Sequence, residues 1–339
     1  MSPIPIIECI PNFSEGRNSK VIQSIVEAMD YVSDARVLHV DIGYDANRTV
    51  ITVAGSPQAV FASVEAGIRM AVKKIDMRDQ IGEHPRIGAV DVCPFVALSG
   101  ISKGDLRAAV EKFAERIAHE LGLPIYLYAQ SAHHPGRFSL FDIRKGQYEG
   151  LKKKMNEEEG IPDYGPSSFN PVFGAMAMGV RDLMIAYNVH LKTSDLPIAR
   201  KIAADLRGSG RWMVRNGKRV QQAGRFSSLK AIGWWMASYG WAQVSMNVMD
   251  FRESPLHEVY EAVSERARAY GIAAQGSELI GLAPEEALKA AGNFYARRAG
   301  ESGELDEDQW MSYAVRGLGL DRLGSIDLRD RIIEYTLRS

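Results

Sequence analysis

The sequence predicts an α/β (α+β) protein made of two βαββαβ subdomains, and three observations support this prediction. The chain has 339 residues, which is more than one ordinary hydrophobic core holds, so two domains are expected. Short apolar runs alternate with amphipathic helical segments along the first half. The same β-α-β-β-α-β order recurs in the second half without repeated residue identity, which indicates two ferredoxin-like units, each a sheet with helices on one face.

The apolar period assigns the elements of the first half in order. Pro57 opens a long helix, and Ser56 before it is a plausible capping residue. Residues 44–47 form the turn between two strands of a hairpin. Strands are expected at 4–13, 36–43, 48–55, 87–98 and 124–130, and helices at 14–30, 56–75, 103–121 and 138–151.

The second half is assigned in the same way, and the predicted subdomains are residues 1–179 and 180–339. Residues 207–226 are expected to be a long loop and a candidate lid. Residues 300–311 look like an acidic connector. Strands are expected at 180–191, 229–238, 241–251 and 272–282, and helices at 193–207, at 254–271, from Pro284 onward and at 328–339.

The composition is that of a soluble globular protein, with 46% hydrophobic and 24% charged residues and a net charge of −1. This balance disfavours a nucleic-acid or membrane-surface binder, including an RNA-binding ferredoxin-like domain, which needs a basic and aromatic sheet face. The N-terminal run has no secretory pattern, and no apolar run reaches about 18 residues, so no spanning helix is expected. Cys9 and Cys93 both stand in apolar contexts, which indicates buried free thiols in a cytoplasmic protein.

Motifs for metal and nucleotide chemistry are missing from the sequence. There is no HExxH or CxxC pattern, and the adjacent His133 and His134 do not converge well on one ion, so no metal is expected. No GxxxxGK[ST] loop is present, and no GxGxxG follows a strand. Nucleotide-dependent chemistry therefore has no support in the sequence.

The stretch "IGEHPRIGAVDVCPF" at 81–95 holds the strongest catalytic candidate. His84 stands between the carboxylate of Glu83 and the guanidinium of Arg86, in a loop that leads into an apolar strand containing Asp91. A loop-to-strand junction presents a side chain on a rigid base, and histidine suits proton transfer near neutral pH. A capping or salt-bridged histidine is the alternative that the sequence leaves open.

Three further stretches combine polar groups in ways that suit a ligand. Asn12 lies in "CIPNFSEGRN", which is also explained as an ordinary helix entry. Asp41 and Arg48 flank one hairpin turn, where an arginine is interpreted as an anion clamp. The segment "YGPSSFNPVFG" at 164–174 offers hydroxyls, backbone amides and aromatic faces, a mixture suited to a flat heterocycle with polar edges.

Together these stretches resemble the formiminotransferase family, in its single-function form without a cyclodeaminase domain. The resemblance covers nearly the whole chain. The matching runs are "ECIPNFSEGRN" (8–18), "VDIGYDANRTV" (40–50), "GEHPRIGAVDVCPF" (82–95), "PIYLYAQSA" (124–132), "PDYGPSSFNPVFGA" (162–175), "LIGL" (279–282) and "RIIEY" (331–335).

The resemblance implies two α/β subdomains whose sheets face each other across a folate-binding cleft. It implies transfer of a formimidoyl group from N-formimidoyl-L-glutamate to tetrahydrofolate, which gives 5-formimidoyltetrahydrofolate and L-glutamate in histidine degradation. Tetrahydrofolate is then a co-substrate. The resemblance places the catalytic histidine on His84 and the folate-contacting segment on Gly165, Pro166, Ser167, Ser168, Phe169, Asn170, Pro171, Val172, Phe173 and Gly174. Where vertebrate-type members have Ser-Trp-Gly, this chain has Val172-Phe173-Gly174.

This chemistry gives a role to each polar candidate. One histidine can accept the proton that N5 of the folate sheds and return it to the departing amine, so His84 is interpreted as general base and acid, with Glu83 or Asp41 orienting its ring. The substrates' carboxylates require anion clamps. Candidates that bind a carboxylate or orient a substrate are Arg48, Arg86 and Asn12, followed by Arg137, Arg144 and Arg225.

Two other functions stay open from the sequence alone. The donor in the first is N-formyl-L-glutamate, which differs by one heteroatom on the reacting carbon. The second is a folate-binding protein that has lost catalysis. The resemblance and the apolar hairpin around Trp234, Trp235 and Trp241 favour a homodimer, and the reaction product is expected to pass to a separate cyclodeaminase.

Overall fold

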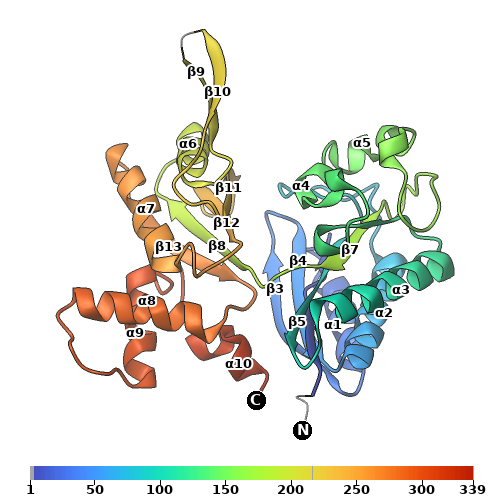
Figure 1. The fold of residues 1–339 in the computed structure, drawn as a ribbon, viewed down its shortest axis with the longest axis horizontal. Helices are drawn as coiled ribbons and strands as arrows, with labels where there is room; N and C mark the ends of the chain where they lie inside the picture. The colour runs from blue at the N-terminus through green and yellow to red at the C-terminus, as the bar shows by residue number, and fades with distance from the viewer. Residues whose placement is uncertain (1–3, 216, 339) are drawn as a thin grey trace. The chain divides into compact units, whose positions relative to one another are not determined.

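A computed structural model of the chain describes residues 4–215 and 217–338. It divides into two compact units that meet at Asp182 and Leu183, where the sequence predicts a boundary at 179/180. In Figure 1 the first unit runs from blue to green and the second from green to red. Among the described residues, no helix combines the length and apolar character that crossing a membrane requires.

Within residues 4–182 the strands form one seven-stranded sheet. Strands β1 and β2 both lie between β4 and β5, and β3 pairs with the outer edge of β4. The elements are β1 (Ile6–Cys9), β2 (Asn12–Phe13), α1 (Ser19–Asp30), β3 (Ala35–Gly43), β4 (Arg48–Gly55), α2 (Pro57–Lys74), β5 (Val90–Ser99), α3 (Lys103–Leu121), β6 (Ile125–Leu127), α4 (Leu140–Ile143), α5 (Gln147–Lys154) and β7 (Met176–Val180).

The first sheet contains the expected βαββαβ core and extends beyond it. β1/β2, β3, β4 and β5 are antiparallel neighbours, whereas β7 adds to β5 in parallel and β6 adds to β7. The single strand predicted at 180–191 is therefore wrong. Residues 176–180 complete the first sheet, and a new strand starts at Ile185 in the second unit, because four irregular residues separate the two apolar runs.

Helices cover both faces of this sheet, which corrects the prediction of one covered face. Helices α1, α2 and α3 pack on one face around Ile7, Val53 and Phe95. On the opposite face, α4, α5 and the turn after them bury a second apolar cluster that includes Val92 and Tyr126. The helix predicted at 138–151 is two short helices, separated by residues 144–146 with Gly146 at a φ of 85°.

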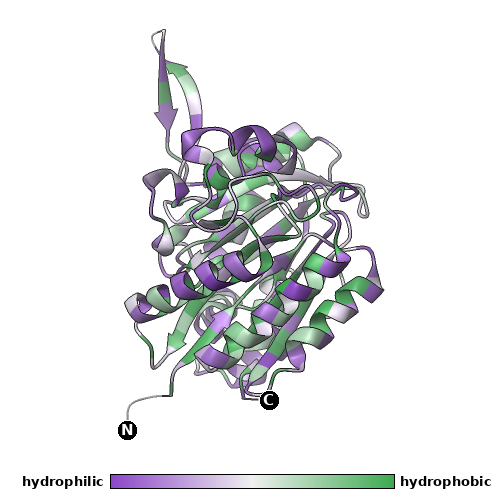
Figure 2. Ribbon diagram, turned by 90° about the vertical axis from the view of Figure 1, so that its right-hand side faces the viewer, coloured by the Kyte–Doolittle hydropathy of each residue, from purple (hydrophilic) through white to green (hydrophobic). Residues whose placement is uncertain are grey.

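Local sequence explains where the helices start. Asn18 caps α1 by accepting hydrogen bonds from the backbone N–H groups of Lys20 and Val21, so the helix predicted from residue 14 begins at Ser19. The predicted cap of α2 is confirmed, since the Ser56 hydroxyl accepts the Ala59 N–H. Figure 2 shows the helices of this unit striped purple and green, as expected of helices with one buried face.

Both cysteines are free and buried, as predicted. They lie on the neighbouring strands β1 and β5, with their Sγ atoms 3.5 Å apart. Burial raises the pKa of the Cys9 thiol well above its usual value, so this sulfur stays protonated and unreactive at neutral pH.

The described residues from 183 onward form a four-stranded antiparallel sheet in the order β11-β12-β8-β13. This order is the ferredoxin-like one, which confirms the second βαββαβ unit. Helices α6, α7, α8 and α9 pack around its core. The elements are β8 (Ile185–Leu191), α6 (Leu196–Leu206), β9 (Arg211–Arg215), β10 (Lys218–Gln222), β11 (Leu229–Met236), β12 (Trp241–Val248), α7 (Leu256–Ala269), β13 (Ala274–Ile280), α8 (Glu285–Arg298), α9 (Glu307–Leu318) and α10 (Ile333–Thr336).

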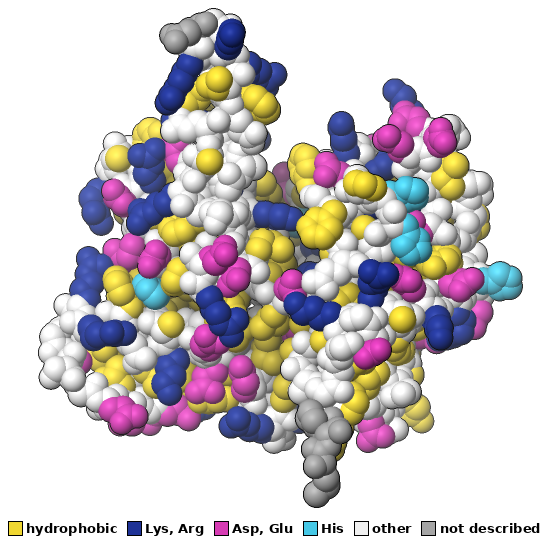
Figure 3. All heavy atoms as spheres, in the orientation of Figure 1, with side chains coloured by type: hydrophobic (Ala, Val, Ile, Leu, Met, Phe, Trp, Pro, Cys, Tyr) yellow, Lys and Arg dark blue, Asp and Glu magenta, His cyan; other side chains and the backbone are white. Residues whose placement is uncertain are grey.

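Residues 207–226 are not the long loop that the sequence predicts. They hold the antiparallel strands β9 and β10, which pair with each other as a separate two-stranded sheet. Trp212 and Val214 on β9 are exposed. Figure 3 shows Lys and Arg side chains along this hairpin, with hydrophobic side chains between them.

The acidic connector predicted at 300–311 is also partly wrong, because α9 begins within it at Glu307. Asp306 accepts the Gln309 backbone N–H, and the Gln309 side chain accepts the Asp306 N–H in return. This reciprocal pair is a capping box, which starts a helix even in an acidic run. Trp310 then lies in the core of the second unit, 2% exposed.

Candidate functional site

His84 lies in the irregular segment between α2 and β5, at one end of the first sheet. Its side chain is partly buried, and its Nδ1 atom lies 2.8 Å from the carbonyl oxygen of Pro85. Because a carbonyl oxygen only accepts hydrogen bonds, this contact places the proton of the neutral ring on Nδ1. The basic lone pair is then on Nε2.

A buried ionic network lies beside this loop, around Asp91 on β5. The Arg48 guanidinium donates to Asp91 Oδ2 at 2.5 Å, and Arg144 donates to the same oxygen from the segment after α4. The backbone N–H of Ile87 donates to Asp91 Oδ1 at 3.0 Å, and Arg48 Nε donates to Asn12 at 3.0 Å. Residues from β2, β4 and β5 and from the α4–α5 segment thus meet in one network.

The electrostatics of this cluster favour a neutral histidine. Burial and the positive charges of Arg48 and Arg144 hold the pKa of His84 well below its usual value, although Asp91 opposes them. Burial alone would raise the pKa of Asp91, but the two guanidiniums outweigh it and hold that pKa at about 2. The arrangement therefore offers a neutral imidazole as a proton acceptor, beside two cations that share one carboxylate.

The segment Gly165–Gly174 is anchored to the same loop. The backbone N–H of Ala89 donates to Phe173 O at 2.8 Å, and that of Ala175 donates to Ile87 O at 3.0 Å. Asn170 Oδ1 accepts the N–H groups of Val172 and Phe173, both at 3.0 Å. The structure thus brings this segment next to the strand that His84 precedes.

Within this segment the residues differ in what they expose. Phe173 is 2% exposed, and its ring packs in the core of the first unit, so it anchors the segment to that core. Phe169 is half-buried and lies against the ring of Tyr148, with centroids 5.5 Å apart. Residues 165–168, 171 and 172 are exposed.

Gly174→Ala is expected to distort this segment. Gly174 has a φ of +77°, and an added Cβ would lie 2.2 Å from the carbonyl oxygen of Ile87. Because the contacted atom is backbone, the strain is expected to cost about 1–3 kcal/mol of stability. Folate affinity is expected to fall as well. Urea unfolding followed by circular dichroism and a folate titration measure both effects.

Gly150→Ala in α5 is the matched control, because nothing lies within 4 Å of its added Cβ. A helical alanine there is expected to leave folate binding unchanged and to stabilise the protein slightly. Wild-type stability and folate affinity in Gly174→Ala would contradict the folate-contacting role that the resemblance implies for this segment.

The other predicted polar residues lie around the cluster in different settings. Arg86 is buried and bound bidentately by Glu149, with N–O distances of 2.7 and 2.9 Å. Asp41 on β3 lies 3.6 Å from His39. The Glu83 side chain is exposed. That Glu83 or Asp41 orients the His84 ring stays a prediction.

Of the three weaker arginine candidates, only one lies in the cluster beside His84. Arg144 joins the Asp91 network. Arg137 pairs with Asp163 at 2.6 Å on the side of the sheet near Tyr126, and Arg225 pairs with Glu265 in the second unit.

Two residues of this site are not among the candidates that the sequence predicts. Asp91 has a detectable sequence signal, because a buried aspartate in an apolar strand indicates an ion-pair partner. Tyr148 has no such signal; its hydroxyl donates to Pro171 O at 2.5 Å and its N–H donates to Arg86 O at 2.8 Å. Tyr148 thereby links the Gly165–Gly174 segment to the loop that carries His84 and Arg86.

The comparisons with known proteins agree with this architecture. Residues 6–181 match the family model described as "Formiminotransferase domain, N-terminal subdomain", and residues 186–338 match "Formiminotransferase domain". The chain therefore belongs to the formiminotransferase family.

Among named relatives, a glutamate formimidoyltransferase of Streptococcus pyogenes serotype M1 is 40% identical over 86% of this chain and 93% of its own length. A glutamate formimidoyltransferase of Thermoplasma acidophilum is 38% identical over 87% and 93%. The formimidoyltransferase-cyclodeaminase of Rattus norvegicus is 41% identical over 97% of this chain, which spans 59% of the length of that relative.

Proposed function

We propose that this protein transfers the formimidoyl group of N-formimidoyl-L-glutamate to tetrahydrofolate. The products are 5-formimidoyltetrahydrofolate and L-glutamate. The observation that carries the proposal is the match over almost the full length of two relatives named glutamate formimidoyltransferase, together with a neutral histidine beside a cationic cluster. Tetrahydrofolate acts as a co-substrate, and its binding is assigned to the segment Gly165–Gly174.

In the proposed mechanism, His84 moves one proton in two steps. Nε2 of His84 accepts the proton that N5 of the folate loses as N5 bonds to the formimidoyl carbon. His84 then returns this proton to the glutamate nitrogen of the tetrahedral adduct, and the bond between that nitrogen and the carbon breaks. No proton is gained or lost overall, so a base that is neutral at the start is the required form.

Two cations and one shared carboxylate leave the cluster with a net positive charge, which suits an anionic substrate. We assign attraction of a substrate carboxylate to Arg48 and Arg144, with Asn12 holding the Arg48 guanidinium in place. Arg86 is better suited to holding the loop, because Glu149 balances its charge one to one, whereas Arg48 and Arg144 share the single carboxylate of Asp91.

A paired assay tests the reaction. The purified protein is mixed with tetrahydrofolate and either N-formimidoyl- or N-formyl-L-glutamate, and the folate absorbance is followed. Rapid turnover of the formimidoyl donor, with the formyl donor much slower, is the expected result. Preference for the formyl donor would move the protein to a formyltransferase, and folate binding without turnover of either donor would make it a binding protein.

The proposal also covers the compartment of the protein, its oligomeric state and the fate of its product. The two unbridged thiols 3.5 Å apart support a reducing compartment such as the cytoplasm. Exposed apolar side chains on β9 and β11 support a homodimer, which sedimentation analysis tests. Consumption of the product by a separate cyclodeaminase is supported by the name formimidoyltransferase-cyclodeaminase, in which the two activities occur together. The place of the reaction in histidine degradation follows from the proposed donor.

A further inference from the structure

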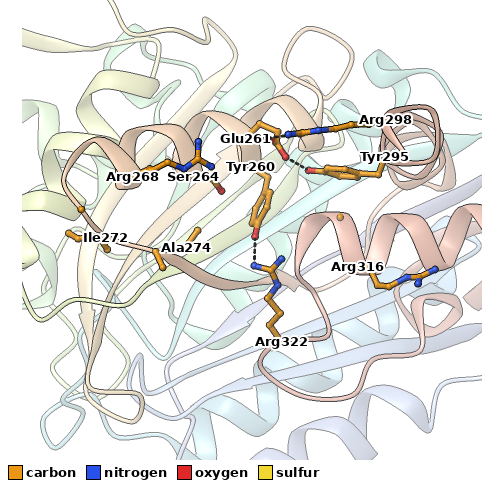
Figure 4. A pocket seen from close by; sticks show the side chains of 13 residues that line it. Tyr260, Glu261, Ser264, Arg268, Ile272, Ala274, Tyr295, Arg298, Arg316 and Arg322 are labelled. Atoms are coloured by element: carbon orange, nitrogen blue, oxygen red, sulfur yellow. Dashed lines mark hydrogen bonds and ion pairs between the residues drawn. The ribbon is translucent and has the colours of Figure 1, made fainter. Parts of the chain in front are cut away.

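The second unit contains a groove to which the mechanism proposed above assigns no role. It has a volume of about 690 Å³ and lies among α7, the start of β13, α8 and α9 (Figure 4). All of its lining residues fall between 260 and 322. It is therefore built by the second unit alone, whereas His84 belongs to the first.

Positive charge dominates this groove. Its lining carries the guanidiniums of Arg268, Arg298, Arg316 and Arg322 but only the carboxylate of Glu261. Glu261 pairs with Arg298 at 2.8 Å. Within residues 4–215 and 217–338, the other three arginines have no carboxylate at ion-pair distance. Their positive charge is therefore not offset by a carboxylate, and Arg268 and Arg322 bring it to this groove.

Two of these arginines are bound by neutral partners, one inside the groove and one at its edge. Arg322 donates to the hydroxyl of Tyr260 at 3.2 Å, and Tyr260 is only 4% exposed (Figure 4). Arg316 donates to the Ser312 hydroxyl at 2.7 Å, and Ser312 lines the neighbouring hollow rather than this groove, so the Arg316 side chain extends away from Tyr260 and Arg322 (Figure 4). The contact with Tyr260 fixes the direction of the Arg322 guanidinium without neutralising it, which lowers the entropy lost when an anion binds.

The remaining walls suit the body of a small organic molecule. Ile272 and Ala274 give an apolar side, and the buried ring of Tyr295 gives an aromatic one. The volume falls in the range of small-molecule sites, about 300–1,000 Å³. A neighbouring hollow lined by Asp306 and Asp308 shares Arg316, so the positive region ends there, which limits the ligand to a compact one.

We propose that this groove binds a small organic polyanion that carries phosphate groups. Guanidinium forks bind carboxylate and phosphate alike, but a phosphate presents about two charges and three acceptor oxygens on one centre, so it can engage more than one guanidinium at once. The proposal does not rest on the proposed transfer reaction, because binding to the groove is measured directly rather than through turnover.

Isothermal titration of the full chain with pyrophosphate, and with citrate as the carboxylate probe, tests the proposal at constant ionic strength. Pyrophosphate is expected to bind at one site with sub-millimolar affinity, more tightly than citrate. Arg268→Ala is the first variant, because Arg268 is exposed in the last turn of α7 and its removal leaves the core intact. It is expected to weaken binding about tenfold.

Arg322→Ala is expected to weaken binding at least as much, and Arg252→Ala is the matched control. Arg252 is an exposed arginine of the second unit that pairs with Glu286 outside the groove, so this variant is expected to bind pyrophosphate as the wild type does. No heat with either probe, equal binding by Arg268→Ala and the wild type, or tighter binding of citrate would each overturn the assignment.

Discussion

His84→Ala is expected to lower kcat by about 10²- to 10⁴-fold while leaving the folate dissociation constant within about threefold of the wild-type value. The imidazole supplies proton transfer rather than ground-state binding, since its Nδ1 is already engaged with the Pro85 carbonyl 2.8 Å away. Initial rates with saturating substrates and a fluorescence titration with folate measure the two effects separately. A kcat within a few-fold of the wild type would contradict the general-base role.

Two further measurements distinguish a proton-transfer role of His84 from a purely structural role. Added imidazole is expected to restore part of the lost rate to His84→Ala, because the deleted side chain leaves space for it. His134→Ala is the matched control, since His134 is exposed in a loop, and it is expected to keep wild-type kinetics. No imidazole rescue together with lost folate binding would indicate a structural role for His84.

The pH profile of the wild-type protein follows from the same environment. A lowered pKa means that His84 stays neutral, and therefore basic, at pH values where an ordinary histidine is already protonated. The acidic limb of kcat/KM is thus expected below pH 6.5. A limb at or above that value would contradict the electrostatic account of the site.

The fold was largely predictable because the spacing of apolar residues indicates which segments are helices and which are strands. Apolar alternation and the order of helices and strands were enough to predict both βαββαβ units. The prediction of a long loop at 207–226 failed because the strands there do not follow the hydrophobic period. The sequence has Asn-Gly at 216–217, a pair typical of hairpin turns. However, β9 and β10 are short and mostly exposed, and the apolar residues of β9 stand in one run, so neither strand shows the alternation of buried apolar and exposed polar positions.

The site was predictable only in part, because it depends on contacts between distant segments. His84 and Arg48 stand out in sequence through their local setting. Arg144 does not, because the chain must fold back over 53 residues before its guanidinium reaches Asp91. Arg86 looked like a substrate clamp beside His84, yet Glu149 from α5 occupies it. Pairing of this kind is a tertiary property that residue type and spacing do not reveal.

Asp91→Asn is expected to be the most destabilising of these substitutions. It removes the buried negative charge that Arg48 and Arg144 share, and it leaves two like charges facing each other with side chains only 9% and 14% exposed. Removing one partner of a buried ion pair lowers the free energy of unfolding by about 3–5 kcal/mol. Glu286→Gln breaks the exposed pair with Arg252 and is expected to cost at most about 1 kcal/mol.

The loss in Asp91→Asn is also expected to depend on pH with a defined sign. The pKa of Asp91 is about 2 in the folded protein and about 3.9 in an unfolded chain. The carboxylate therefore contributes stability that is complete above pH 5 and is lost as the pH falls toward 2. The difference in unfolding free energy between the wild type and Asp91→Asn is expected to shrink over that range.

The tryptophans show where in the chain this destabilisation occurs. All five, at positions 212, 234, 235, 241 and 310, lie in the second unit, so their fluorescence follows that unit while circular dichroism follows both. Asp91→Asn is expected to shift the dichroism transition to lower urea and the fluorescence transition much less. It is also expected to move the acidic limb of kcat/KM further down, because Asp91 raises the pKa of His84. An unchanged dichroism midpoint would show that the Asp91 network does not stabilise the first unit.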